Sequence, residues 1–436
     1  MSFRALLLGV TALASACALS TAGDEGSSTS TTHHEGATGS GGSLFPVTTS
    51  SGDGVTSSSS SAAVTASASS ASAGSGGMGG TGGATASSGT GGGPPTDWWD
   101  PSWGYRVKIK LTNHAQGEDL VDFPVLVTLT AGKVKLTNLA DAGADVRFVD
   151  PDGTLLDHEI EQWQPGAKVL WVRVPQVDKG TDEDFIWLYY GNPSATDAQN
   201  PGGVWQNDYT AVLHLGDDLG TSSPQLHDSS GHANDGAWTA ATGAGTTAGE
   251  AGDGVHVKGA AAITIADSGD FDAANNEDRT FELWFKTAAQ QGITTFVSKY
   301  GDCRGWSASI GDSGSTKGTV TAEVITADDC NDPSPKTATV TSTGTDYGDS
   351  AFHQLVVVSK RDGEETLAVY LDGVQVGLQT PADNKSGNDG PLVIQGVDGI
   401  FDELRASDVA RSTAWIAAGR LSASDAFTAF QPNETY

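Results

Sequence analysis

The sequence predicts an all-β protein in which two β-sandwich domains, the second larger than the first, follow a disordered linker rich in Ser, Thr and Gly. Three observations support this fold class. Apolar and polar residues alternate over many short runs, turn residues separate these runs, and almost no stretch has the spacing of an amphipathic helix. The runs form two groups, over residues 97–200 and 205–425, and the chain beyond the linker is long enough for two cores.

Residues 1–17 form a predicted lipoprotein-type signal segment. One positive charge, an apolar run and small residues before Cys17 are typical of an export signal, and the run is too short to span a bilayer as a stable helix. The stretch 13–17 resembles a bacterial lipobox, which implies that Cys17 becomes the first mature residue and is lipidated. The alternative is ordinary signal cleavage near Ala16 or Ala18. The resemblance implies an exported protein that is lipid-anchored at the cell surface or outer membrane, on the periplasmic or extracellular face.

Residues 18–96 form a predicted tether made almost entirely of Ser, Thr, Ala and Gly, without a single Lys or Arg. Such a segment cannot bury enough apolar surface to offset the entropy lost on ordering, so we expect it to be disordered. A flexible chain of this length has a root-mean-square span of about 45–55 Å. Its predicted role is to hold the folded domains away from a membrane.

The charge balance excludes one class of partner. The chain has 54 acidic and 23 basic residues, a formal net charge of −31. Binding to a phosphate backbone requires clustered Lys and Arg, and so does direct adhesion to anionic lipid. We therefore expect no nucleic-acid partner, and contact with a membrane only through the lipid anchor.

The three cysteines predict one disulfide. An exported protein meets an oxidising compartment, and lipidation of Cys17 leaves Cys303 and Cys330 as a pair. Strand-like runs over 305–310 and 319–326 form a predicted hairpin whose open end brings both cysteines together. In the chain-entropy model, closing this loop contributes about 3.6 kcal/mol to stability.

The first predicted domain, residues 97–200, has six strand-like segments, over 105–111, 123–130, 146–149, 155–163, 169–174 and 185–190. It resembles the family called domain of unknown function 2341, on the motifs Trp103-Gly-Tyr-Arg106, Asp122-Phe-Pro-Val-Leu126, Asp145-Val-Arg-Phe148, His158-Glu-Ile-Glu-Gln-Trp163 and Tyr189-Tyr-Gly-Asn-Pro193. That family occurs in secreted bacterial proteins just before a laminin-G-like domain. The resemblance implies no established chemistry.

Two glutamates in this domain invite a catalytic interpretation. Glu159 and Glu161 alternate with Ile160, so they share one face of a strand about 6.6 Å apart. This spacing is compatible with a glycosidase carboxylate pair. Because Ile160 points inward between them, we interpret the pair instead as a solvated acidic face.

Three tryptophans at the start of the domain, Trp98, Trp99 and Trp103, admit two interpretations. They could form an aromatic platform that stacks on sugar rings. We favour core filling or docking of the linker.

The second predicted domain, residues 205–425, has ten to thirteen short strand-like runs, and one helix over 412–418 that Ser412 caps and Gly419 ends. It resembles the concanavalin A-like, laminin-G-type jelly roll, on the motifs Ala211-Val-Leu-His214-Leu, Asp228-Ser-Ser-Gly231 through Asn234-Asp-Gly236, Phe281-Glu-Leu-Trp284-Phe285, Phe352-His353-Gln354, Tyr370-Leu-Asp372-Gly373 and Ile400-Phe-Asp402-Glu403-Leu-Arg405. Jelly rolls of this family often bind a structural Ca²⁺ through loop oxygens. The resemblance therefore implies Asp228, Asn234 and Asp402 as candidate calcium ligands, competing with plain turn and surface carboxylates.

The sequence contains none of the common signatures of hydrolases, nucleotide-binding proteins or zinc enzymes. The Glu-x-Asp-x-x-Glu run of β-glucanases, a nucleophile elbow, a P-loop and zinc-type Cys/His spacing are all missing, and a regular strand would point the adjacent Asp402 and Glu403 to opposite faces. We therefore predict no catalytic residues and a surface-tethered, non-catalytic binding or adhesion protein, for glycans or extracellular protein partners. One alternative is a jelly-roll glycoside hydrolase whose carboxylate pair comes from separate strands. The other is a purely structural surface protein. The sequence does not identify the ligand-binding residues.

Overall fold

The computed structural model describes residues 97–436, apart from 273–276, 289–291, 314–315, 328–329, 333–334, 345, 362–365 and 381–385. The predictions made for 1–17 and 18–96, Cys17 included, concern residues outside this description. Within the described residues, helices are too short or too polar to cross a membrane.

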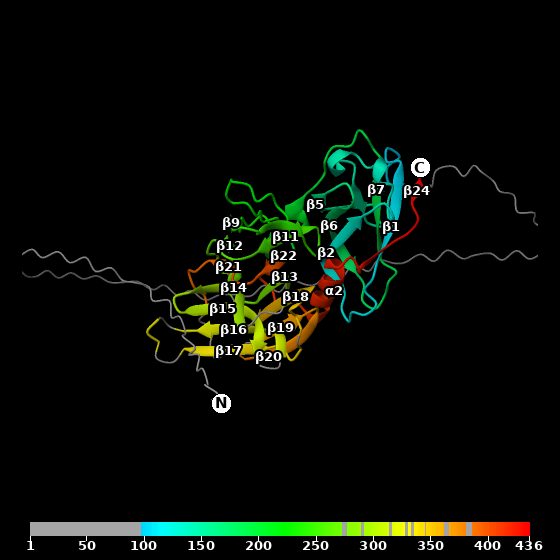
Figure 1. Ribbon diagram of the computed structural model, residues 1–436. Helices are drawn as coiled ribbons and strands as arrows, with labels where there is room; N and C mark the ends of the chain where they lie inside the picture. The colour runs from blue at the N-terminus through cyan, green and yellow to red at the C-terminus, as the bar shows by residue number, and fades with distance from the viewer. Residues whose placement is uncertain are drawn as a thin grey trace, which may run out of the picture. The chain divides into compact units, whose positions relative to one another are not determined.

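The first β-sandwich pairs a six-stranded sheet with a three-stranded sheet (Figure 1). The six-stranded sheet has the order β23-β1-β7-β3-β4, with β24 also paired to β1; its strands are β1 (Tyr105–Leu111), β3 (Arg147–Val149), β4 (Leu155–Leu156), β7 (Phe185–Tyr190), β23 (Thr428–Phe430) and β24 (Glu434–Thr435). The three-stranded sheet has the order β2-β6-β5, from β2 (Leu120–Leu129), β5 (His158–Trp163) and β6 (Lys168–Val177).

The end of the chain completes the first sandwich rather than the second. β23 and β24 pair antiparallel with β1, with Ile109 opposite Phe430 and Arg106 opposite Glu434. The Arg106 guanidinium donates to the Glu434 carboxylate at 2.8 Å. These two strands lie beyond both predicted domain ranges, so the first sheet is assembled from segments more than 300 residues apart.

The second β-sandwich pairs an eight-stranded sheet with a seven-stranded sheet (Figure 1). The eight-stranded sheet has the order β10-β11-β22-β13-β18-β19-β20, with β8 also paired to β22; its strands are β8 (Tyr209–Leu213), β10 (Gly245–Ala248), β11 (Asp253–Val257), β13 (Arg279–Ala288), β18 (Asp349–Lys360), β19 (Thr366–Leu371), β20 (Val374–Gln379) and β22 (Gly399–Ser407). The seven-stranded sheet has the order β17-β16-β15-β14-β21-β12-β9, from β9 (Gly236–Thr239), β12 (Ala262–Ile265), β14 (Ile293–Gly301), β15 (Arg304–Ser313), β16 (Thr316–Thr326), β17 (Lys336–Thr341) and β21 (Leu392–Ile394).

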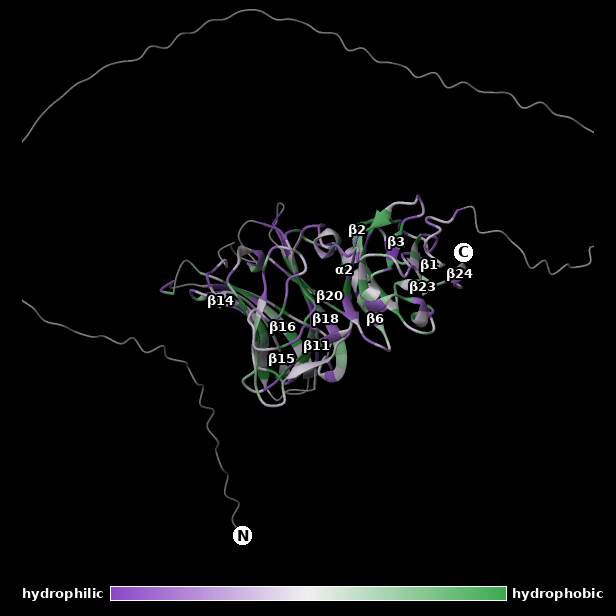
Figure 2. Ribbon diagram, turned by 90° about the horizontal axis from the view of Figure 1, so that it is seen from above, coloured by the Kyte–Doolittle hydropathy of each residue, from purple (hydrophilic) through white to green (hydrophobic). Residues whose placement is uncertain are grey.

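Hydrophobic and hydrophilic residues are intermixed along the strands (Figure 2), and strand residues alternate between two environments. In β6, Leu170 and Val172 belong to the core of the first sandwich, whereas Val169 and Trp171 face the other way. Val169 and Trp171 belong to a separate apolar cluster that also contains Val212 of β8. The three-stranded sheet is therefore covered on both faces, and its outer face lies against the eight-stranded sheet of the second sandwich.

The predicted helix is present but longer than expected. α2 (Thr413–Ala423) begins where the Oγ of Ser412 accepts the backbone N–H of Trp415 at 3.0 Å. It continues past Gly419 because Ala418 and Ala423 are both buried, Ala418 in the first core and Ala423 in the cluster between the two sandwiches. A second helix, α1 (Pro201–Val204), joins the two sandwiches in sequence.

The predicted disulfide is confirmed. Cys303 and Cys330 are bonded, with their Cα atoms 5.0 Å apart, at the open end of the β15–β16 hairpin.

The tryptophans at the start of the first domain pack against its other aromatic residues, which agrees with a structural role for them. Trp98 lies 5.5 Å from Tyr189 between ring centroids, and the Arg106 guanidinium lies 4.7 Å from the Trp98 ring centroid.

Candidate functional site

A β-bulge in β22 places three charged residues on one face of the eight-stranded sheet. Glu282 of β13 pairs with Arg405 and Trp284 pairs with Asp402, so one residue of β13 opposes both Glu403 and Leu404. Glu403 adopts a left-handed φ of 48°. Asp402, Glu403 and Arg405 consequently all face the first sandwich. The prediction that a strand would point Asp402 and Glu403 to opposite faces is wrong, because the extra residue breaks the period of two.

The opposite wall of the site is the outer face of the three-stranded sheet. Glu159 pairs with Trp171 across β5 and β6, and a bulge at Glu161 keeps that side chain near the same face. The side chains of Glu159 and Glu161 are only 9% and 4% exposed. The interpretation of this pair as a solvated acidic face is therefore wrong, because the second sandwich covers it.

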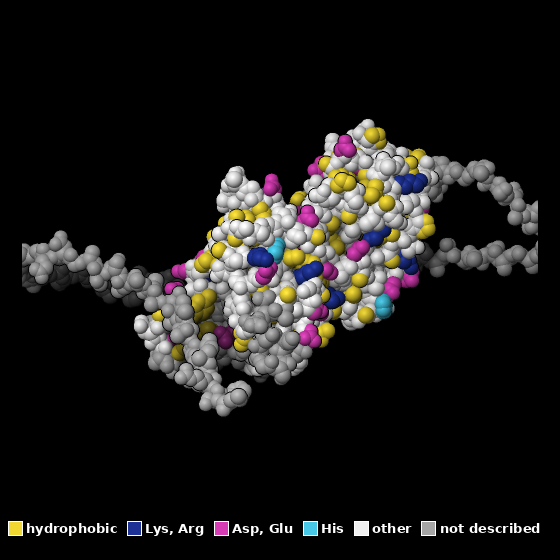
Figure 3. All heavy atoms as spheres, in the orientation of Figure 1, with side chains coloured by type: hydrophobic (Ala, Val, Ile, Leu, Met, Phe, Trp, Pro, Cys, Tyr) yellow, Lys and Arg dark blue, Asp and Glu magenta, His cyan; other side chains and the backbone are white. Residues whose placement is uncertain are grey.

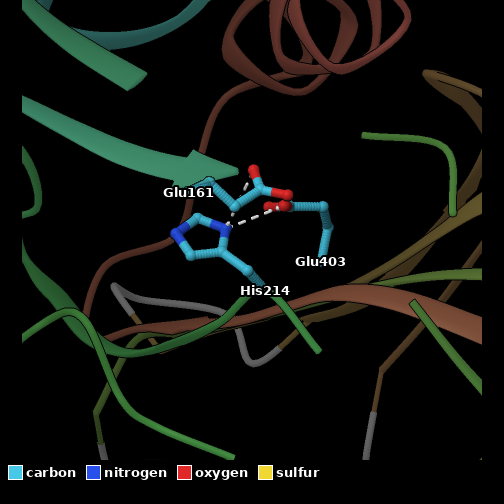
Figure 4. Close-up of side chains that lie close together, drawn as sticks. All are labelled: Glu161, His214 and Glu403. Carbon is cyan, nitrogen blue, oxygen red and sulfur yellow. Dashed lines mark hydrogen bonds and ion pairs between the residues drawn. The ribbon is translucent and has the colours of Figure 1, made fainter. Parts of the chain in front are cut away.

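His214, which follows β8, lies between the two walls (Figure 4). Its Nδ1 atom lies 2.8 Å from Oε1 of Glu403 and 3.6 Å from Oε2 of Glu161. Its Nε2 atom lies 3.3 Å from Oε2 of Glu159. A single imidazole from the second sandwich thus contacts two carboxylates of the first sandwich and one of its own.

Each carboxylate of this acid–histidine cluster (Glu159, Glu161, His214 and Glu403) has a further donor. The indole N–H groups of Trp205 and Trp171 donate to Glu159 at 2.7 Å and to Glu161 at 2.8 Å. The Oγ of Ser229 donates to the other oxygen of Glu159 at 2.5 Å. The guanidinium of Arg405 donates to Oε2 of Glu403 and stacks on Trp171. The cluster is fixed by groups from both sandwiches.

Burial and mutual contact set the protonation of the cluster. Burial opposes the charged form of His214, but Glu403, Glu159 and Glu161 raise the pKa of the imidazole well above its usual value. Burial likewise opposes ionisation of Glu403, yet His214 and Arg405 lower the pKa of that carboxyl. Burial also opposes ionisation of Glu159, but the contact with His214 lowers the pKa of this carboxyl as well. By contrast, burial raises the pKa of Glu161 well above the ordinary range, and the carboxylates around it add to the effect.

The predicted calcium ligands occupy two different places. Asp228 and Asn234 lie in one loop, where the backbone N–H of Asn234 donates to Oδ2 of Asp228 at 3.0 Å. Asp402 is fully buried, and its Oδ2 accepts the backbone N–H groups of Glu250 and Ala251 at 2.7 and 2.9 Å. In the described part of the chain, no hydrogen bond joins Asp402 to the other two. Calcium binding stays a prediction that rests on the loop of Asp228.

In the described part of the chain, the His and carboxylate residues whose ligand atoms converge closely enough to hold a metal ion are Glu161, His214 and Glu403, within 4.8 Å of one another. Sequence reasoning did not bring them together. The available signal was that His214 directly follows the apolar run of β8 and that Glu403 lies among charged residues in a largely buried strand.

Family models match two parts of the chain. Residues 142–226 match the domain of unknown function 2341, and residues 257–417 match the concanavalin A-like lectin/glucanases superfamily. The chain carries both domains, in this order. The match to the domain of unknown function 2341 continues through β8, so it includes Glu159, Glu161 and His214, whereas Glu403 belongs to the concanavalin A-like match.

Solved structures that match the chain include the binding domain of Paraclostridial Mosquitocidal Protein 1, with a TM-score of 0.41 and 13% identity over 50% of this chain and 53% of that chain. They also include the binding domain of botulinum neurotoxin DC in complex with SialylT, with a TM-score of 0.38 and 12% identity over 50% of this chain and 52% of that chain. Each match thus spans about half the length of the solved chain. No curated protein matches the sequence.

Proposed function

We propose that this chain is a non-catalytic, surface-tethered protein that binds glycans through its concanavalin A-like domain. A lipid on Cys17 would anchor the chain, and residues 18–96 would serve as the tether. The superfamily to which the domain belongs includes both lectins and glucanases in its description. The choice between binding and cleavage therefore depends on the residues of this chain.

Burial argues against a catalytic role for the converging acids. Glu161 and Glu403 come from separate strands, which is the arrangement that the hydrolase alternative requires. A glycosidase pair must straddle a sugar bond, with the carboxyl groups about 5–9.5 Å apart and open to substrate. Here Glu403 is fully buried, Glu161 is nearly so, and both are engaged with His214. A sugar chain cannot reach them without separating the two sandwiches.

The main support for the proposal is a row of hydroxyl groups on the outer face of the seven-stranded sheet. Across four neighbouring strands, Thr295, Ser309, Thr321 and Thr341 stand in one register. Their hydroxyls already form cross-strand hydrogen bonds, at 3.0 Å between Thr295 and Ser309 and at 3.1 Å between Thr321 and Thr341. Hydroxyl groups both donate and accept, which suits the hydroxyls of a sugar.

An exposed aromatic ring lies on the same face. Tyr300 of β14 is 46% exposed, and its neighbour Lys299 points into the protein, so Tyr300 points outward with Ser298. Ser298 pairs with Ser307 on β15, and Ser307 pairs with Glu323 on β16. An aromatic face beside hydroxyls and one carboxylate is the combination that packs on a sugar ring and orients it by hydrogen bonds. The surface drawn in Figure 3 is otherwise mixed, with acidic and basic side chains interspersed.

A glycan array followed by product analysis tests this proposal. The proposal predicts that the chain binds at least one class of glycan and that the bound sugar is recovered unchanged. Tyr300→Ala is expected to weaken binding about two- to tenfold, since one stacked ring contributes about 0.5–1.5 kcal/mol. The matched control is Tyr436→Ala, which removes a tyrosine of similar exposure from the first sandwich. Cleaved products would favour the hydrolase alternative. If no glycan on the array is bound, the purely structural alternative is favoured.

A further inference from the structure

Three ligand atoms of the acid–histidine cluster have the spacing of a metal site. The distances from His214 Nδ1 to Glu403 Oε1 and to Glu161 Oε2 are 2.8 and 3.6 Å. With zinc–ligand bonds of about 2.0–2.1 Å, the edge of a zinc tetrahedron is about 3.3 Å. The two distances from His214 Nδ1 lie on either side of this value, and all three ligand atoms lie within 4.8 Å of one another. Figure 4 shows both carboxyl groups on the same side of the ring.

The groups around these atoms are those that a metal site requires. A metal-bound histidine usually donates its second ring N–H to a carboxylate, which fixes the tautomer and directs the other nitrogen at the metal. Glu159 occupies this position, 3.3 Å from Nε2 of His214, and is itself held by Trp205 and Ser229. Trp171 holds Oε2 of Glu161, and Arg405 holds the second oxygen of Glu403.

One oxygen of the cluster has no hydrogen-bond partner among the described residues. This atom is Oε1 of Glu161, which is buried in a side chain that is only 4% exposed. An unsatisfied buried acceptor is costly, at about 1–3 kcal/mol, and more for a charged group. A Cβ atom on Gly252 would lie 2.2 Å from this oxygen, so glycine at that position keeps the space beside it open. A carboxylate that binds a metal through both oxygens would satisfy it.

From these observations we infer that Glu161, His214 and Glu403 form a zinc site that links the two sandwiches. Glu161 comes from β5 of the first sandwich, whereas His214 and Glu403 come from the eight-stranded sheet of the second. The imidazole ligand favours zinc over calcium and magnesium, which take oxygen ligands. The two carboxylates, when ionised, balance the charge of one Zn²⁺. This structural role is independent of glycan binding.

The test is zinc binding by the full chain after treatment with a chelator and removal of the chelator. Isothermal titration is expected to show one zinc per chain at this site, and X-ray absorption of the zinc complex to show one nitrogen and several oxygen ligands at about 2.0 Å. Zinc is also expected to raise the melting temperature by several degrees.

Two variants make the result specific. Glu161→Gln keeps the shape of the ligand and is expected to weaken zinc binding at least tenfold, with Glu159→Gln producing a similar or smaller loss. The matched control is His256→Gln, which removes a partly exposed histidine that bonds Asp398 at 2.7 Å. Circular dichroism shows whether each variant is folded. The inference is overturned if the folded wild type binds no zinc, or if Glu161→Gln binds zinc as tightly as the wild type does. Either result would mean that the cluster is an ion-pair network only.

Discussion

Nε2 of His214 lies 3.3 Å from Oε2 of Glu159, so a side chain of the eight-stranded sheet is held by the three-stranded sheet of the other sandwich. This contact lies among buried indole rings, with the centroid of Trp171 6.0 Å from that of His214. Both sandwiches fall in one compact unit. The domain of unknown function 2341 therefore contributes a wall of the acid–histidine cluster as well as a core of its own.

Glu403→Gln is expected to destabilise both sandwiches. The substitution removes a buried negative charge between His214 and Arg405 and leaves the guanidinium without its anion. Removing one partner of a buried ion pair lowers the free energy of unfolding by about 3–5 kcal/mol. Urea unfolding in the presence of a chelator measures the loss. Glu183→Gln, which breaks an exposed pair with Lys110, is the control and should leave the free energy of unfolding unchanged. An equally small effect of Glu403→Gln would contradict the account.

The free energy of unfolding should fall as the pH is lowered below 6.5, in part because of His158. Burial, and then the nearby Arg147, lower the pKa of this histidine from 6.5 to about 4. The unfolded chain then binds a proton that the folded chain does not, so the contribution is complete above pH 6.5 and is lost toward pH 4. Between pH 7.5 and 5 the loss is about 2 kcal/mol.

Urea unfolding of His158→Gln at both pH values isolates this contribution. Glutamine does not titrate, so the variant should lose less stability than the wild type over the same interval. An identical pH dependence in the two proteins would show that His158 is not the group responsible.

The sequence predicted the architecture well and the cluster poorly. The alternation of apolar residues in segments such as 105–111 directly records which face of a strand is buried. The bulge at Glu403 inserts one residue that no local pattern announces, and it breaks the period of two from which Asp402 and Glu403 were predicted to face opposite ways. Glu159 and Glu161 do share one face, as the alternation in β5 predicted, and both contact His214.

The burial of Glu159 had a second cause that the sequence could not reveal. Alternation around Ile160 shows that one face of β5 is apolar, and it says nothing of what covers the other face. That face is covered by a domain about fifty residues further along the chain. Trp284 illustrates the same limit: it is buried, and it faces the cluster between the sandwiches rather than the jelly-roll core.

Replacing both Cys303 and Cys330 with serine should lower the free energy of unfolding. The bonded cysteines are 27 positions apart, and opening a loop of this length costs about 3–4 kcal/mol in the chain-entropy model. Thermal or urea unfolding of the variant and of the oxidised wild type measures the change, and a reductant should lower the stability of the wild type to that of the variant. A thiol assay that found both groups free without reduction would remove the basis of this prediction.

Deleting residues 428–436 should loosen the first sandwich, although these residues follow the second. The deletion removes β23 and β24 and exposes the edge of β1, including the partners Ile109 and Arg106. Hydrogen exchange should become at least tenfold faster in β1 and stay unchanged in β14 of the second sandwich. Unchanged exchange in β1 would mean that the C-terminal strands do not support the sheet.

The calcium prediction is checked by the melting temperature after EDTA and then excess Ca²⁺. A site on the loop of Asp228 and Asn234 predicts a fall followed by recovery, and Asp228→Asn should abolish the response. Zinc-free buffers keep this test separate from the acid–histidine cluster. A melting temperature that neither treatment changes would end the calcium prediction.

The most direct test of the account is a titration of the chain with a glycan selected on the array, followed by mass analysis of the recovered sugar. The expected results are saturable binding, a Kd raised about two- to tenfold by Tyr300→Ala, and a sugar of unchanged mass. Shortened sugar, or an unchanged Kd for Tyr300→Ala, would contradict it.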